Sequence, residues 1–204
     1  MKNWLGKTKC PIFVQEFPKN TRIFLRLRRY LSPKQRKQLY YTLIYPDINY
    51  AVASWGSAST SNLKKIQVKQ NLIVRLMFFA TLYGRHTESA FPSLLNLLDL
   101  LSVESIFAFQ LLKFCHQWHK KQLPDIFDEH FRYACDVHSY NTRYASKANF
   151  YKEHFRTNAG KRTTLAMAVK LWQELPIELK HVKHFNFRKK VQQYLLVKQI
   201  HCES

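Results

Sequence analysis

Acidic side chains gather at one place in the chain where they could hold catalytic cations. Asp125, Asp128 and Glu129 follow Pro124 closely. A two-metal polymerase or nuclease needs clustered carboxylates that hold its cations about 4 Å apart. Acidic residues are also favourable at the start of a helix, where they face the positive end of the helix dipole. We interpret these three as helix-start residues, and the sequence predicts no catalytic residue.

Cysteine and histidine occur together at spacings that could bind a metal. Cys115 is followed by His116 and His119, and Cys135 by His138. Zinc modules usually pair their ligands across a tight turn, whereas the first group lies in an apolar stretch of helical character. We interpret these residues as a buried thiol and surface imidazoles that bind no common metal. The sequence therefore predicts neither a metal site nor a cofactor.

The segment HSYNTR, residues 138–143, carries groups that recognise nucleic acid. Tyr140 can stack on a base, Asn141 can hydrogen-bond a base edge and Arg143 can bind a phosphate. The alternative is a loop in which Asn141 bonds its own backbone and Tyr140 packs on the core. The residue types leave both interpretations open.

Basic side chains recur at helical spacing elsewhere. Arg22, Arg26 and Arg29 share one face of a helix expected from Asn20, where forked guanidinium donors could follow a phosphate backbone. The alternative is an ordinary solvated arginine face. The apolar face of this helix is formed by Ile23, Leu27, Tyr30 and Leu31. Further candidates for phosphate contact lie on two later helices: Lys64, Lys65, Lys69 and Arg75 on one, and Arg188, Lys189 and Lys190 on the other.

Residues 31–82 form the segment around which we expect the fold to be organised. Ser32 suits an N-cap and Pro33 the first helical position, and Pro46 forces a break. A short aromatic segment then ends at Trp55-Gly56, and a second amphipathic helix follows the polar residues 57–62. We expect the two helices to pack together.

The remaining elements complete a mainly α prediction: a helical bundle with an irregular connector and a small basic helical C-terminal part. Residues 1–19 are expected as a poorly packed or extended leader. The later helices are expected at 92–101, 103–121 (capped by Ser102), briefly after Pro124, at 164–174 and at 187–200, with the connector at 135–149. The predicted division is 1–30 (basic leader and arginine-faced helix), 31–134 (helical core) and 135–204 (basic C-terminal region).

Charge is concentrated at both ends of the 204-residue chain, whose formal net charge is +20. Residues 1–37 hold 11 basic and 1 acidic side chains, residues 38–137 hold 9 and 8, and residues 138–204 hold 13 and 4. Such an excess repels itself unless a polyanion meets it. Nucleic acid is the commonest such partner, and an anionic membrane surface is the alternative.

Other classes are disfavoured by composition. With 4 Gly the chain has no glycine-rich phosphate loop. The most apolar window, 91–115, contains Asp99 and Glu104, so no membrane span is expected. Four scattered Cys and no visible signal peptide favour an intracellular protein, nuclear or cytoplasmic.

An ordered set of motifs resembles one family of polymerases. The run YTLIYPDINYA at 41–51, closing on Trp55-Gly56, is similar to the "LYxxLIxPxxxYxxxxWG" stretch that follows the palm in reverse transcriptases of non-LTR retrotransposons (LINE, jockey-like). Later features arrive in the family's order. They are 67–75, similar to "LQxKxxRxI"; 123–124 with 138–143, similar to "LPxxF…HxYxTR"; 169–176, similar to "GxxxWNxLP"; and 187–196, similar to "FKxxLKxYLL".

The resemblance implies the thumb and downstream region of an RNA-directed DNA polymerase. The sequence contains no palm aspartate pair, so it implies no self-contained catalytic site. A helical thumb grips the primer–template duplex, so the implied partners are RNA, DNA or their hybrid, bound without sequence preference, and the palm of the parent polymerase. Two alternatives remain: a helical protein-interaction module without nucleic-acid function, and a non-functional retroelement remnant.

Overall fold

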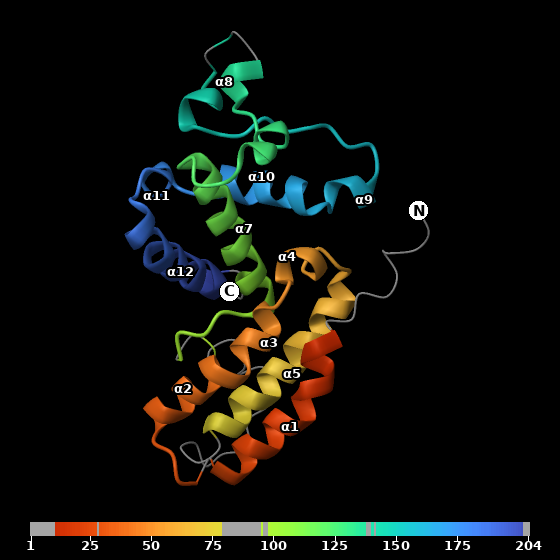
Figure 1. Cartoon of the computed structure of the whole chain (residues 1–204), viewed down its shortest axis with the longest axis vertical. Coiled ribbons are helices and arrows are strands. Elements are labelled where there is room, and N and C mark those ends of the chain that lie inside the picture. Colours follow the sequence, from red (N-terminus) through yellow and green to blue (C-terminus); the bar gives the residue numbers. More distant parts are fainter. Residues whose placement is uncertain are drawn as a thin grey trace. The chain divides into compact units, whose positions relative to one another are not determined.

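The structure, a computed structural model, describes residues 11–27, 29–78, 95, 98–137, 140 and 142–201 (Figure 1). These residues are mainly helical, and the β-type pairing among them is the isolated bridge between Tyr133 and Phe150. The predicted mainly α fold is therefore confirmed. The chain divides into two compact units, one made of Met1–Ile106 with Leu196–Ser204 and the other of Phe107–Leu195. The boundaries expected from the sequence, 30/31 and 134/135, stay predictions.

The first unit is built on five helices before residue 79. They are α1 (Pro11–Leu27), α2 (Pro33–Leu43), α3 (Tyr45–Asn49), α4 (Val52–Trp55) and α5 (Thr60–Phe78). Ser32 caps α2 as predicted, because its side chain accepts from the Gln35 amide while Gln35 Oε1 accepts from the Ser32 amide at 2.8 Å. Such a capping box satisfies two helix-end donors at once. Helix α2 ends at Leu43, and α3 begins at Tyr45 with Pro46 in its first turn. The predicted break at Pro46 is therefore confirmed.

The helices of the first unit pack around an aliphatic core. Helix α5 contacts both α1 and α2, and α3 also contacts both of them (Figure 1). The predicted packing of the helices at 33–43 and 60–78 is therefore confirmed. Ile44, Ile48, Ile73 and Val74 are fully buried. Burial of such side chains, at about 1.5–3 kcal/mol each, drives the assembly of helices that are too short to be stable alone.

Helix α1 differs from the prediction in start, end and buried face. It begins at Pro11, so the extended leader predicted for 1–19 is wrong from residue 11 onwards; packing on α5 and α3 outweighs the weak local pattern. It ends at Leu27, so Arg29 lies in the following turn. Over residues 19–27 of this helix Asn20 and Phe24 are buried, whereas Ile23 and Leu27 are exposed, as is Tyr30 in the following turn.

Asn20 explains the rotation of this helix. Its Nδ2 donates to the Leu43 carbonyl at 3.3 Å and to Asp47 Oδ2 at 2.9 Å. A buried amide needs such partners, and these fix α1 against the end of α2 and the start of α3. The prediction of the buried face used the spacing of apolar residues, and that spacing does not reveal hydrogen bonds of a buried polar side chain.

The second unit contains most of α7 (Val103–His119) and of α12 (His184–His201), which also contribute to the first unit. Between them lie η2 (Asp125–Glu129), α8 (Ala134–Val137), η3 (Ala145–Lys147), α9 (Asn158–Lys161), α10 (Thr164–Glu174) and α11 (Ile177–Lys180). The predicted helix at 164–174 is confirmed to the residue, and α12 starts three residues earlier than predicted. Most of the helix predicted at 92–101 lies outside the described residues.

Aromatic rings form the centre of the second unit. Trp172 of α10 is completely buried and stacks on Phe150 with ring centroids 5.2 Å apart. Its Nε1 donates to the Ala148 carbonyl at 3.0 Å. Trp118 of α7 meets Phe150 edge-on at 5.2 Å. The predicted connector at 135–149 thus contains turns and two short helices, and its end is anchored on α7 and α10.

Candidate nucleic-acid interface

The basic residues predicted on the first two amphipathic helices lie on elements that pack together. Arg22 and Arg26 are exposed on α1, and Lys64, Lys65 and Arg75 are exposed on α5. Lys69 is half-buried. Figure 1 shows α1 and α5 side by side in the first unit. We call Arg22, Arg26, Lys64, Lys65, Lys69 and Arg75 the α1–α5 basic set.

Helix α5 is amphipathic in the sense expected. One side of the helix is buried and contains Ile66, Gln70 and Ile73. The opposite side is exposed and contains Lys64, Val68 and Arg75. No acidic residue occurs in α5, so nothing on this helix offsets its positive charge. Such a side can attract a polyanion at long range.

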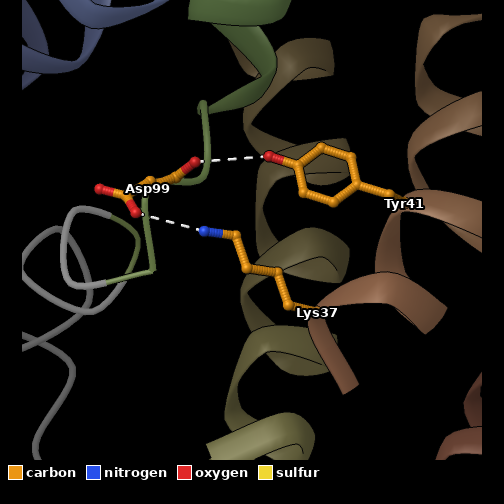
Figure 2. A network of polar contacts seen from close by, with 3 residues as sticks. All are labelled: Lys37, Tyr41 and Asp99. Atoms are coloured by element: carbon orange, nitrogen blue, oxygen red, sulfur yellow. Dashed lines mark hydrogen bonds and ion pairs between the residues drawn. The ribbon is translucent and has the colours of Figure 1, made fainter. Parts of the chain in front are cut away.

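Other basic side chains of the first unit serve the fold. Arg36 is 8% exposed, and its guanidinium donates to the Met77 carbonyl at 2.7 Å and to the Leu31 carbonyl at 2.8 Å. Lys37 pairs with Asp99 at 3.2 Å, and the Tyr41 hydroxyl donates to the Asp99 carbonyl at 3.4 Å (Figure 2). Arg36 and Lys37 are therefore engaged in contacts within the first unit.

The predicted residues of the second unit lie on two elements. Tyr140 is 79% exposed and Arg143 is exposed, both between α8 and η3, while Asn141 lies outside the described residues. Tyr140 therefore does not pack on the core, which contradicts that part of the alternative interpretation. Arg188, Lys189 and Lys190 are all exposed near the start of α12. The buried face of that helix is formed by Phe187, Val191 and Leu195.

The acidic cluster has a structural role in part. Asp128 accepts a hydrogen bond of 2.7 Å from Trp118 Nε1 and lies 3.9 Å from the Lys121 ammonium. Asp125 and Glu129 are exposed in η2. Asp128 thereby fixes the ring of a core tryptophan, as a buried indole N–H requires a partner.

The cysteine and histidine residues considered as metal ligands lie in different environments. Cys115 is buried, with its Sγ 3.7 Å from the Ala168 carbonyl, whereas Cys135 is exposed and His138 lies outside the described residues. His116 Nε2 lies 3.0 Å from the Val182 carbonyl. In the part of the chain that the structure describes, no group of three or more His, Cys, Asp or Glu could hold a metal ion.

Histidine side chains of α7 lie near histidines of the segment 181–184. The His116 and His184 rings stack at 5.9 Å, and the His119 and His181 rings are 6.2 Å apart. Burial, with help from Lys120 and the other imidazoles, lowers the pKa of His119 to about 4. Burial also lowers the pKa of His116. Both shifts disfavour the charged imidazolium form of these rings.

The sequence interpretation missed the basic residues of a pocket in the second unit. This pocket, of about 700 Å³, includes Arg132, Lys152, Lys161 and Lys170 in its lining. These residues come from four segments without a common period, so no spacing pattern links them. Lysine and aromatic residues alternate along 151–161, and this pattern could have indicated the basic, aromatic lining of the pocket.

Together these features define a mainly helical protein with exposed cationic helices and no described helix long and apolar enough to cross a membrane. Comparison with protein-family models, with curated proteins and with solved structures gives no match.

Proposed function

We propose that the chain is the thumb and downstream region of a non-LTR retrotransposon reverse transcriptase, and that it binds nucleic acid through the phosphate backbone without sequence preference. Its partners are RNA, DNA or their hybrid, and the palm of the parent polymerase. The chain acts inside the cell, in the nucleus or the cytoplasm. It contributes binding rather than chemistry.

One observation carries the binding proposal. Two packed helices, α1 and α5, expose Arg22, Arg26, Lys64, Lys65 and Arg75, and α5 has no acidic residue. Lysine and arginine that meet phosphates release condensed counterions, and this release supplies most of non-specific affinity. Phosphate contacts position a protein on a duplex and do not read bases.

The motif residues of the resemblance support the same assignment by positioning these helices. Trp55 Nε1 donates to the Tyr50 carbonyl at 2.8 Å, which closes the turn between α3 and α4. Gln67 Oε1 accepts from the Val103 amide at 2.8 Å. The Gln67 bond ties α5 to the start of α7, while Lys64, Lys65 and Arg75 of α5 remain exposed.

The test is titration of the full chain onto a labelled RNA–DNA hybrid at several salt concentrations. We expect log affinity to fall linearly with log salt. The double variant Arg26→Gln/Lys64→Gln should reduce the steepness of that line by about 1–2, since each lost phosphate contact removes about 0.9.

A matched control removes the same charge elsewhere. Lys120→Gln/Lys121→Gln lies in the turn after α7, where Lys121 is near Asp128. It should leave the salt dependence nearly unchanged. Absence of binding at low salt by a chain with a helical circular dichroism spectrum, or equal losses in both double variants, would overturn the proposal.

A second candidate function, a helical protein-interaction module, is favoured by apolar side chains on the same side of α5. Val68 is 66% exposed and Leu72 is 41% exposed. The palm of the parent polymerase is one partner that could cover them. Self-association that persists at high salt and is abolished by Val68→Ser/Leu72→Ser would support this function over backbone binding.

A further inference from the structure

The pocket of the second unit has an apolar and aromatic lining. Phe155 and Tyr151 contribute rings, and Leu165, Ala166 and Val169 contribute one side of α10. Its volume of about 700 Å³ falls within the roughly 300–1,000 Å³ of ordinary ligand sites. The pocket is therefore large enough for a flat organic group lying against the rings.

Charge around this lining is mainly positive. Arg132, Lys152, Lys161 and Lys170 contribute cations, against the carboxylates of Glu129 and Glu153. The four cationic residues are exposed, so each can reach a ligand that extends out of the pocket. The combination complements a ligand with an apolar planar part and attached anionic groups.

The aromatic walls are fixed by the backbone. The Tyr151 amide donates to the Arg132 carbonyl at 2.7 Å, and the Ala134 amide donates to the Asn149 carbonyl at 3.0 Å. This pairing holds the segment that carries Tyr151 beside the one that carries Arg132.

The ring of Phe155 lies close to a glycine. A Cβ atom at Gly160 would lie 2.9 Å from Phe155 Cδ1 and 3.0 Å from its Cβ. The first of these contacts is closer than real Cβ atoms come, so the absence of a side chain at Gly160 leaves room for the ring against α9. Thr157 caps this helix by accepting from the Gly160 amide at 3.1 Å.

We propose that this pocket binds an unpaired nucleotide of a single-stranded nucleic acid. The base lies against Phe155 and Tyr151, and the flanking phosphates meet Lys152, Lys161 and Lys170. Stacking tolerates any base because every base has a π-face, and cationic side chains follow the backbone. The site goes beyond the proposed duplex contact, because a paired base could not reach the rings.

The experiment measures binding of the full chain to a fluorescent single-stranded oligothymidine and, separately, to a duplex of equal length. Phe155→Leu keeps an apolar side chain but removes the π-face. It should weaken single-strand binding on the order of tenfold while leaving duplex binding unchanged. Phe185→Leu is the matched control, since Phe185 is 91% exposed and outside the pocket lining.

Two further variants keep the test decisive if Phe155→Leu unfolds. Gly160→Ala should displace the ring and weaken single-strand binding. Lys152→Gln/Lys161→Gln should weaken it and lower its salt dependence. Unchanged single-strand affinity in these variants, with melting temperatures near that of the parent chain, would overturn the proposal.

A competition measurement separates this site from other occupants and from the proposed function. Displacement of the oligonucleotide by polyglutamate at comparable concentration would instead assign an acidic peptide to the pocket. Loss of duplex binding in Arg26→Gln/Lys64→Gln with retained oligothymidine binding would show that the two sites act independently.

Discussion

The amide of Gln70 donates a 2.8 Å hydrogen bond to the hydroxyl of Tyr40, and both side chains are buried. The same amide donates to the Leu101 carbonyl at 2.8 Å. Gln67, one turn earlier, accepts from the Val103 amide. These bonds join α2, α5 and the start of α7, and the two that Gln70 donates are buried. Buried polar networks that are fully paired specify one arrangement of their helices.

Replacing Gln70 by Leu should destabilise the first unit strongly. The Tyr40 hydroxyl and the Leu101 carbonyl would lose a partner each, and an unsatisfied buried group costs about 1–3 kcal/mol. Tyr40→Phe removes one partner while Gln70 keeps its bond to Leu101, so its cost should be about 0.5–1.5 kcal/mol. Urea unfolding of both variants measures these changes.

The control for this pair is Val68→Ala, an exposed position on the same helix. Its effect should stay within about 0.5 kcal/mol. A Gln70→Leu variant as stable as the parent chain would show that these bonds contribute nothing to stability.

Arg36→Met should destabilise the chain without changing nucleic-acid binding. Its guanidinium bonds two carbonyls, those of Leu31 and Met77, and hydrogen bonds to charged groups contribute about 1.5–3 kcal/mol. Met77 lies near the C-terminal end of α5, whose last carbonyls have no intrahelical donor. Urea unfolding should give a loss of at least about 2 kcal/mol.

The exposed Lys34 on the same helix supplies the matched charge loss. Lys34→Met should change the free energy of unfolding by less than about 0.5 kcal/mol. Under conditions where both variants are folded, the salt dependence of hybrid binding by Arg36→Met should equal that of the parent. A clear drop would make Arg36 a phosphate ligand.

Local signals predicted much of the fold. Ser32 and Pro33 mark the start of α2, and Pro46 marks the break after it. In each case the deciding interaction lies within a few residues of the signal. A capping side chain bonds a nearby backbone amide and a proline fixes its own φ angle. Both effects are local, so they can be predicted from the sequence without knowledge of the tertiary structure.

The rest depended on partners distant in sequence. The buried face of α1 contains Asn20, whose partners Leu43 and Asp47 belong to other helices. Lys180 is 1% exposed, and its ammonium donates to Asn149 Oδ1 at 2.7 Å. Arg132 and Tyr151 of the pocket lie beside each other because the Tyr151 amide donates to the Arg132 carbonyl. The periodicity of apolar residues in the sequence does not predict these long-range contacts.

Lys180 should make the stability of the chain rise with pH above neutrality. Burial, followed by repulsion from Lys147, lowers its pKa from 10.5 to about 8. Between about pH 8 and 10.5 the unfolded chain therefore binds more protons than the folded chain, and the free energy of unfolding increases with pH. Below pH 8 both states are protonated and the lysine contributes no slope.

The measurement is urea unfolding at several pH values between about 7 and 10. Each unit of pKa difference corresponds to about 1.4 kcal/mol. In Lys180→Met this rise should shrink, whereas Lys183→Met, an exposed neighbour, should retain it. Equal slopes in both variants would assign the rise to other groups.

His119 should make the chain sensitive to acid. Its Nδ1 lies 2.7 Å from the Tyr133 hydroxyl, and burial together with Lys120 lowers its pKa from 6.5 to about 4. Between pH 6.5 and about 4 the unfolded chain binds the extra proton, so stability is lost as pH falls through that window. From the pKa difference the loss is on the order of 2 kcal/mol by about pH 4.5.

The variant His119→Gln removes the titrating group and keeps a side chain that can hydrogen-bond Tyr133. Its urea midpoint should fall less than that of the parent between about pH 7 and 4.5. His130→Gln provides the control, because His130 is exposed and its loss should leave the acid sensitivity intact. If His119→Gln loses as much stability on acidification as the parent, the sensitivity belongs to the neighbouring His116, whose pKa burial also lowers, or to the carboxylates.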